Sequence, residues 1–210
     1  MARALAVIPA CGESRRMQRP KLLLPWKTST VIAAVVRSWL STPIDRLLIV
    51  CRASDAPLLE HLEELRASHG QRLEIIRLDP PPREMKASIA AAIHHLTREV
   101  ASCDPQDVPA DYLAIAPGDL PRLPAEVISR LLEQIPTDAV VQPSIAGRLR
   151  HPVLLPWSVA RQILKLDASE TLATLVQRAS CKAVPCDDLA SPRDFADLDT
   201  PEEYQQLLDD

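Results

Sequence analysis

Glycine and aromatic residues are scarce in this sequence. It contains four glycines, three tryptophans, two tyrosines and one phenylalanine in 210 residues. With so few aromatic side chains, the core must be built from Leu, Ile, Val and Ala. Two glycine-rich phosphate loops are excluded as well. The pattern GxxxxGK followed by Ser or Thr does not occur, and Gly12 lacks the companions that would complete GxGxxG.

Long apolar runs, an excess of positive charge and closely paired cysteines are also missing. No segment reaches the roughly 20 apolar residues of a membrane span, and Pro9 interrupts the short run Ala4–Ala10. We therefore expect a soluble protein without a membrane partner, in which this run is a buried strand. The net charge of −4 argues against nucleic acid as a partner. Five cysteines without short paired spacing predict free thiols and a cytoplasmic compartment.

Short apolar runs alternate with helical patterns along the chain, and 20 prolines mark many of the boundaries. This alternation is typical of an α/β fold with a mostly parallel sheet, and we expect one domain over residues 1–210. The expected strands are Leu5–Ile8, Leu47–Cys51, Leu73–Leu78, Tyr112–Ala116, Ala139–Val141, Val153–Leu155 and Lys182–Pro185. The expected helices are Thr30–Leu40, a helix capped by Ser54 and ended by Gly70, Met85–Val100, Pro124–Ile135, Trp157–Leu166, Thr171–Ala179 and 201–209, with a loop over 101–110.

The stretch from Pro9 to Lys21 directly follows the first expected strand. Small residues precede a group of cations that is unusual in this acidic protein, namely Arg15, Arg16, Arg19 and Lys21. Small residues let backbone N–H groups approach phosphates, and cations neutralise phosphate charge. The crevice beyond the carboxyl ends of the strands is also where ligands bind in open α/β sheets. On composition alone, a triphosphate-binding loop and a solvated basic turn are equally good interpretations.

Two further segments offer carboxylates to a metal ion. Asp119 follows the expected strand Tyr112–Ala116, at the edge of the sheet that faces the crevice. Asp197 and Asp199 precede the last expected helix. Structural roles are open for each, because Asp119 can begin a turn, and Asp199 with Thr200 can form the N-terminus of a helix.

The loop resembles the signature of the molybdenum-cofactor nucleotidyltransferase family, Leu-Ala-Ala-Gly-x-Ser-x-Arg-Met-Gly-x-x-Lys. The matching residues are Ala10, Gly12, Ser14, Arg16, Met17 and Lys21, whereas Pro9, Cys11 and Gln18 depart from it. The resemblance implies a three-layer αβα, Rossmann-like fold of the nucleotide-diphospho-sugar transferase type. It also implies nucleotide contacts by Ala10, Gly12, Ser14, Arg16, Lys21 and Ser88. In this interpretation Arg16 and Lys21 act in catalysis by stabilising charge on the phosphates.

The carboxylate segments are similar to motifs of the same family. Gly118 to Pro121 is similar to Gly-Asp-x-Pro, and Asp197–Tyr204 is similar to Asp-Ile-Asp-Thr-Pro-Glu-Asp-Tyr. These similarities imply Mg²⁺ as the metal, with Asp119 as one ligand and Asp199, in preference to Asp197, as the other. His151 lies in a segment similar to Arg-Gly-His-Pro-Val, and it is either an acceptor contact or a structural histidine.

Two substitutions depart from the family pattern at the expected site. Glu84–Ile89 corresponds to Gly-Met-Gly-Ser-Ser-Leu beside the nucleotide base; Ser88 matches, but Lys86 stands where close backbone approach is usual. Arg150 likewise replaces a glycine. These changes predict either an altered base pocket or a weakened or lost activity.

The resemblance implies a Mg²⁺-dependent nucleotidyltransferase. The phosphate of an acceptor, with molybdopterin favoured, attacks the α-phosphorus of a nucleoside triphosphate, and pyrophosphate leaves. CTP is the favoured donor because Pro20–Trp26 continues the loop as in the molybdopterin branch. A sugar-phosphate nucleotidyltransferase would share the fold and loop, but the chain has no insertion to hold a sugar. A catalytically degenerate nucleotide- or cofactor-binding protein is the third alternative, favoured by Lys86 and Arg150.

Overall fold

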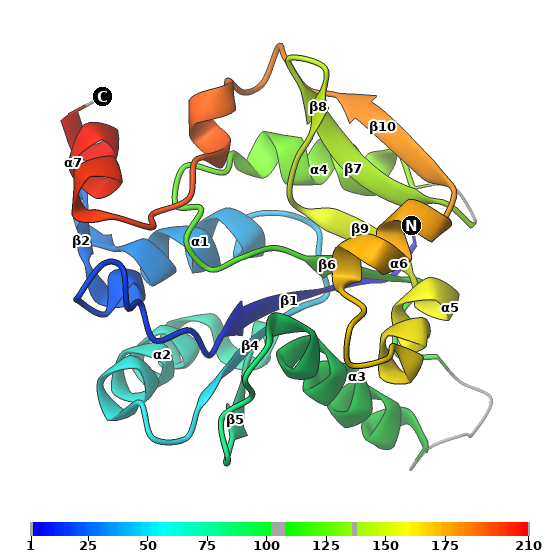
Figure 1. Ribbon diagram of the computed structural model, residues 1–210, viewed down its shortest axis with the longest axis horizontal. Helices are drawn as coiled ribbons and strands as arrows, with labels where there is room; N and C mark the ends of the chain where they lie inside the picture. Colours follow the sequence, from blue (N-terminus) through cyan, green and yellow to red (C-terminus); the bar gives the residue numbers. More distant parts are fainter. Residues whose placement is uncertain (1, 102–107, 136–137, 210) are drawn as a thin grey trace.

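The computed structural model describes residues 2–101, 108–135 and 138–209 (Figure 1). The expected loop over 101–110 and Cys103 therefore lie largely or wholly outside the described residues. Within the described residues, the main sheet consists of β1 (Ala4–Ala10), β4 (Arg46–Arg52), β5 (Leu73–Leu78), β6 (Tyr112–Ile115), β7 (Val140–Ile145), β8 (Arg148–Leu149), β9 (Val153–Pro156) and β10 (Cys181–Pro185). Their order is β10-β7-β9-β6-β1-β4-β5, with β8 paired to β7.

The centre of the sheet is parallel, as the alternating sequence pattern predicted. β1 pairs in parallel with both β4 and β6, and β4 pairs in parallel with β5. β9 runs antiparallel to β6 and β7. Because β1 and β6 are parallel neighbours, their carboxyl ends meet at one edge of the sheet. The loop after Ala10 and the turn that carries Asp119 consequently lie side by side.

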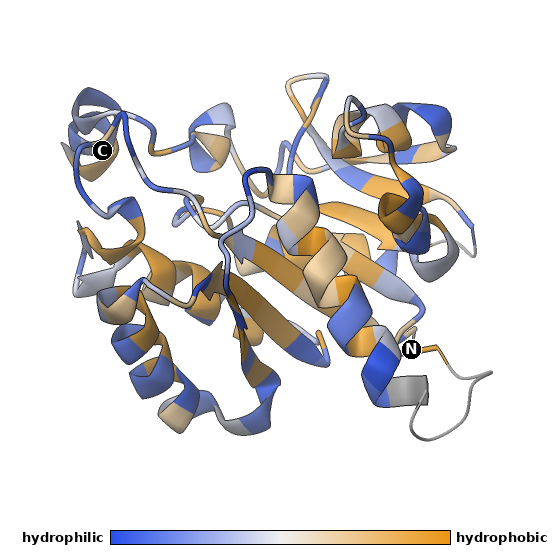
Figure 2. Cartoon of the chain, turned by 60° about the horizontal axis from the view of Figure 1, so that its bottom comes forward, coloured by the Kyte–Doolittle hydropathy of each residue, from blue (hydrophilic) through white to orange (hydrophobic). Residues whose placement is uncertain are grey.

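Helices cover both faces of the sheet. In β1, Ala4, Ala6 and Ile8 belong to one apolar cluster, and the alternating Leu5 and Val7 belong to another. The first cluster includes side chains of α1 (Val31–Leu40), α2 (Ala56–His69) and α4 (Ala125–Glu133). The second includes α3 (Met85–Ala101), α5 (Trp157–Ala160) and α6 (Leu172–Arg178). The expected three-layer αβα architecture is confirmed, and Figure 2 shows apolar residues concentrated in the strands.

Local capping explains where two of the helices begin. Thr30 caps α1, because its hydroxyl accepts from the Ala33 N–H at 3.2 Å. For α2 the prediction of Ser54 was wrong by one residue: Asp55 accepts from the Leu58 N–H. Gly70 ends α2 at a positive φ of 59°, a conformation that glycine adopts at low cost.

Several short elements differ from expectation. The expected helix Trp157–Leu166 is divided into α5 and a 3-10 helix, η3 (Arg161–Lys165). Strands β2 (Pro25–Trp26), β3 (Ser29–Thr30) and β8 were not predicted, since two-residue strands carry no periodic signal. The remaining elements are α7 (Pro201–Asp209) and the 3-10 helices η1 (Lys21–Leu23), η2 (Gly70–Arg72) and η4 (Pro192–Phe195). No helix in the described part of the chain is long and apolar enough to cross a membrane.

Candidate functional site

The loop after β1 is closed by its own backbone. The Gln18 N–H donates to the Ser14 carbonyl at 3.1 Å, and the Lys21 N–H donates to the Ser14 hydroxyl at 3.2 Å. Ser14 and Gln18 both have positive φ, at 50° and 55°. Glycine adopts a positive φ most easily. This explains why the family signature has glycine where this chain has Gln18. Ser14 shapes the loop and also lines the cavity beside it.

A small apolar cluster brings this loop to the C-terminal segment. Met17 is 2% exposed and Leu198 is fully buried, and both pack in one cluster with Leu24, Trp26, Val31 and Leu207. Burial of Leu198 fixes the backbone between Asp197 and Asp199. Burial of Met17 fixes the neighbouring Arg16. The two segments are distant in sequence, yet this packing places their charged residues within contact distance.

Four charged side chains form one ion-paired cluster at the carboxyl edge of the sheet. Lys21 Nζ pairs with Asp119 and lies 3.3 Å from Asp199 Oδ1. Arg16 Nη2 lies 2.9 Å from Asp199 Oδ2. Desolvation acts to lower the pKa of Lys21, but the charges and hydrogen bonds of Asp119 and Asp199 together raise it. The structure thus brings both expected catalytic cations together with both expected metal carboxylates.

Asp119 is buried, and only one of its two carboxylate oxygens is paired within the described part of the chain. It is 5% exposed, and its buried Oδ1 has no hydrogen-bond partner among the described residues, while Oδ2 pairs with Lys21. A buried, unpartnered carboxylate oxygen is costly unless a ligand completes it. Carboxylates are suitable ligands for Mg²⁺, so Asp119 and Asp199 fit this ion.

Asp197 also faces this group of charges but pairs less closely with it. Desolvation, followed by repulsion from Asp119 and Asp199, raises the pKa of Asp197 above its ordinary value. Arg16 and Lys21 both form ion pairs with Asp199, at 2.9 Å and 3.3 Å. The geometry therefore favours Asp199 as the second carboxylate.

The cluster opens into a cavity of about 420 Å³. Its lining residues include Ala10, Gly12, Ser14, Arg16, Lys21, Ser88, Asp119, His151, Asp197 and Asp199. A Cβ added to Gly12 would meet no atom within 4 Å, and the φ of Gly12 is not positive. Neither packing nor backbone strain explains this glycine, whereas the close approach of a ligand would.

Ser88 reaches the cavity from the first turns of α3. It is 1% exposed and interacts with the thiol of Cys11, which itself donates to the Val50 carbonyl at 3.4 Å. Burial raises the pKa of Cys11, and the opposing effects of Ser88 and Arg52 do not offset it. Cys11 is therefore a neutral packing residue rather than a reactive thiolate.

Lys86 does not enter this cavity. Its ammonium group turns away and donates to three backbone carbonyls, those of Asp167 at 2.7 Å, Ala168 at 2.9 Å and Glu170 at 2.6 Å. The side chain is only 16% exposed. The three carbonyls therefore hold the charge of Lys86 outside the residues that line the first cavity.

A second cavity of about 820 Å³ adjoins the first. It shares Glu84, Met85 and His151 with the first cavity, and its far wall is formed by the segment Glu170–Gln177. Burial lowers the pKa of His151, and its Nδ1 is buried without a hydrogen-bond partner among the described residues. Arg150, also flagged from the sequence, lines neither cavity but a third hollow beside Asp197.

Sequence reasoning singled out Glu84 but missed Pro82 and Arg83, which precede it in the segment between β5 and α3. Pro82, Arg83 and Glu84 line the first cavity, and Arg83 adds a cation there. The sequence contained a signal that these residues line a site, since the segment follows the carboxyl end of a parallel strand. The sequence motifs assigned no individual role to two cations of the loop, Arg15 and Arg19. Arg15 is 85% exposed and pairs with Glu13, and Arg19 lines a hollow on the other side of the loop.

Known proteins are similar to this chain in sequence and in fold. Residues 6–184 match the family model of the MobA-like NTP transferase domain. A probable molybdenum cofactor guanylyltransferase of Bacillus anthracis is 28% identical, with 100% of this chain and 98% of that protein covered. A molybdenum cofactor guanylyltransferase of Shewanella loihica is 36% identical over 47% of this chain and 52% of its own length.

Solved structures support the expected type of fold. A nucleotidyl transferase from Methanothermobacter has a TM-score of 0.77 at 20% identity, covering 99% of this chain and 96% of its own. A 4-diphosphocytidyl-2C-methyl-D-erythritol synthase has a TM-score of 0.69 at 15% identity, covering 100% and 99%. The fold is that of the nucleotide-diphospho-sugar transferases. The match over residues 6–184 places the chain in the family of MobA-like NTP transferase domains, and it is a nucleotidyltransferase.

Proposed function

We propose that this protein transfers GMP from GTP to the phosphate of molybdopterin and releases pyrophosphate. The observation that carries the proposal is the cluster of Arg16, Lys21, Asp119 and Asp199 around the open backbone at Gly12. The donor follows from the full-length curated relative, which is named for guanylyl transfer. CTP, expected from Pro20–Trp26, has no support among these relatives. The cytidylyl enzyme of similar structure shares only the fold.

The positive and negative charges of the cluster neutralise one another within the protein. A bound nucleotide and metal ion would replace these ion pairs with stronger interactions. Arg16 and Lys21 now neutralise the two carboxylates. A triphosphate would take over both cations, and a divalent metal would take over Asp119 and Asp199. Asp119 Oδ1, which has no partner in the described part of the chain, would gain one.

The protein's contribution to the chemistry is positioning and charge stabilisation. An oxygen of the acceptor phosphate forms a bond to the α-phosphorus, and the bond from that phosphorus to the pyrophosphate oxygen breaks. Lys21 and Arg16 neutralise the charge that accumulates on the phosphate oxygens. Asp119 and Asp199 would hold Mg²⁺, and the ion would supply Lewis-acid stabilisation of the phosphate charge. A structural neighbour from Mycobacterium tuberculosis is described as a complex with manganese, which supports a divalent metal.

The second cavity is suited to the acceptor. It adjoins the cation cluster through Glu84, Met85 and His151, so a molecule seated there could direct a phosphate at the nucleotide. Burial lowers the pKa of His151 and so favours its neutral form, and its buried Nδ1 has no hydrogen-bond partner among the described residues. The position of Lys86 outside the nucleotide cavity argues for an active enzyme over the degenerate binding protein.

Nucleotide selectivity tests the proposal. Thermal unfolding is measured with GTP, CTP, ATP and UTP in parallel, each with and without Mg²⁺, and pyrophosphate release is then measured with molybdopterin. We expect GTP to be the only one of the four nucleotides that stabilises the protein strongly. We also expect pyrophosphate release only when GTP is the donor. At a concentration 100-fold above Kd, the stabilisation should be about 2.7 kcal/mol. Selective stabilisation by CTP would refute the donor, and binding without turnover would favour the degenerate binding protein.

A further inference from the structure

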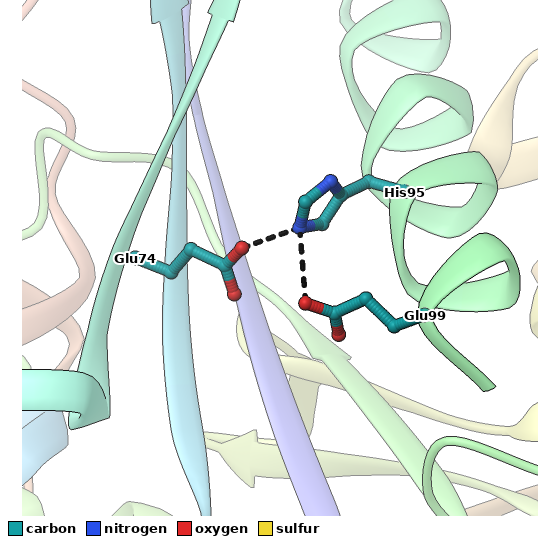
Figure 3. Close-up of side chains that lie close together, drawn as sticks. All are labelled: Glu74, His95 and Glu99. Carbon is teal, nitrogen blue, oxygen red and sulfur yellow. Dashed lines mark hydrogen bonds and ion pairs between the residues drawn. The ribbon is translucent and has the colours of Figure 1, made fainter. Parts of the chain in front are cut away.

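A group of metal-ligating side chains lies far from the nucleotide cavity. Glu74 on β5, together with His95 and Glu99 on α3, converges on one point, as Figure 3 shows. One ligand atom from each residue lies within 4.8 Å of the other two. His95 Nε2 is hydrogen bonded to Glu74 Oε1 and lies 3.5 Å from Glu99 Oε1. The spacing of His95 and Glu99 by one helical turn presents both on the same face of α3.

Arg46 holds the two carboxylates in this arrangement from the opposite side. Its Nη1 lies 3.0 Å from Glu74 Oε2, and its Nη2 lies 2.7 Å from Glu99 Oε2. A weaker bond joins Nη1 to Glu99 Oε1 at 3.3 Å. Each carboxylate is thus anchored through Oε2 while its Oε1 faces His95. Ligands of metal sites are commonly oriented by such outer hydrogen bonds, which limit their reorganisation when the ion binds.

The donor set and spacing fit a first-row divalent ion. One imidazole and two carboxylates are ligands that Zn²⁺ accepts, whereas Mg²⁺ prefers oxygen alone. With metal–ligand distances of about 2.1 Å, a tetrahedral site has ligand atoms about 3.4 Å apart. The separation of 3.5 Å between His95 Nε2 and Glu99 Oε1 matches this edge. The Glu74 oxygen that is hydrogen bonded to His95 would have to withdraw from it to match this edge too.

We propose that Glu74, His95 and Glu99 form a binding site for Zn²⁺ or a similar transition-metal ion, with water as the remaining ligand. The metal takes the place of the hydrogen bond between His95 Nε2 and Glu74 Oε1, and the imidazole proton moves to Nδ1, so that His95 stays neutral. The three side chains are 23–38% exposed, so the ion and its water have access from solvent. With two carboxylates and Arg46, the group carries one net negative charge, which a divalent ion reverses.

This site would act on the fold rather than on the nucleotide. The helix α3 extends from Ser88 in the first cavity to Glu99, about 16 Å along its axis at 1.5 Å per residue. A metal would tie that helix to β5, the last strand in the order of the sheet. Edge strands are paired on one side only, and an added link to α3 would oppose their fraying.

Metal titration of the intact protein tests the site, with His94 as a matched control. His94 is the exposed neighbour of His95 on α3 and belongs to no such group. We expect one equivalent of Co²⁺ to produce visible d–d absorption and Zn²⁺ to raise Tm in the wild type and in His94→Gln. In His95→Gln and Glu99→Gln, metal affinity should fall at least tenfold, measured as the metal-dependent change in Tm against each variant's own baseline.

Three outcomes would overturn the site. Equal Zn²⁺ affinity of His95→Gln and the wild type would assign the ion to other residues. A thiolate-to-cobalt charge-transfer band would assign it to a cysteine such as the exposed Cys181. Loss of the effect in Asp119→Asn, with His95→Gln unaffected, would assign the ion to the nucleotide cavity. Nucleotidyl transfer is tested separately by pyrophosphate release, so failure of this site leaves the proposed function standing.

Discussion

Lys21 and Asp119, which are 98 residues apart in sequence, form an ion pair at the carboxyl edge of the parallel sheet. The pair joins the loop after β1 to the turn after β6. It forms because those two strands are parallel neighbours, so their ends lie together. In the proposed function, this pair and its neighbours Arg16 and Asp199 separate when a nucleotide and metal bind.

Removal of Lys21 should weaken nucleotide binding. In Lys21→Met we expect the Kd for GTP with Mg²⁺ to rise at least tenfold, about 1.4 kcal/mol, because a phosphate loses its cation. Asp119 is also left buried and unpaired, which should lower the free energy of unfolding by about 3 kcal/mol. The control is Arg15→Met in the same loop, whose side chain is 85% exposed and pairs with Glu13. Calorimetric titration of both variants measures the difference, and equal affinities would remove Lys21 from the site.

The apolar cluster under the site should govern both stability and binding. Leu198→Ala removes a fully buried side chain between Asp197 and Asp199, and we expect a loss of about 2–5 kcal/mol in the free energy of unfolding. GTP affinity should fall too, since Asp199 is no longer held beside Arg16. Leu208→Ala on α7 is the control, because Leu208 is 40% exposed. Denaturant unfolding measures the midpoint of each variant. An equal shift of the two midpoints would contradict the role given to Leu198.

Lys86 should affect the acceptor and not the nucleotide. In Lys86→Met, the carbonyls of Asp167, Ala168 and Glu170 lose their donor, and the wall of the second cavity loosens. We expect a higher KM for molybdopterin with an unchanged Kd for GTP. The exposed Lys165 on η3 provides the control substitution, Lys165→Met. A change confined to GTP binding would mean that Lys86 acts in the first cavity.

His151 should make the protein sensitive to mild acid. Its pKa is lowered in the folded state, so the unfolded chain takes up a proton at a higher pH than the folded protein does. The stabilisation is therefore complete above the ordinary histidine pKa of about 6.5 and is lost as pH falls below it. Melting temperatures between pH 7.5 and pH 5 should fall more steeply for the wild type than for His151→Gln. Parallel curves would show that His151 is not the group responsible.

Helices with a clear apolar period and strands with a continuous apolar run were predictable. The continuous run of β1 arises because both faces of the sheet are buried. The predicted limits of Leu73–Leu78 are those of β5. The short strands β2, β3 and β8 were not predictable, since each depends on a partner fixed by tertiary packing. Ser54 and Asp55 are both good caps, and a choice between adjacent caps requires the backbone geometry.

The site could be predicted from the sequence as a set of residues but not as an arrangement. Arg16, Lys21, Asp119 and Asp199 were expected from motifs, and the structure brings all four together. Their mutual ion pairing was not foreseeable, because it depends on the burial of Met17 against Leu198. The orientation of the Lys86 side chain could not be predicted either, since its carbonyl partners lie more than eighty residues away in sequence.

The most direct measurement is Mg²⁺-dependent pyrophosphate release from GTP and molybdopterin by Asp119→Asn, Asp199→Asn and Asp197→Asn. The account predicts a loss of at least a hundredfold, about 2.7 kcal/mol of transition-state stabilisation, in the first two variants. It predicts near wild-type turnover in Asp197→Asn. Melting curves of each variant confirm that it is folded. Undiminished turnover in Asp119→Asn would contradict the claim that this carboxylate and its partner Asp199 hold the metal for nucleotidyl transfer.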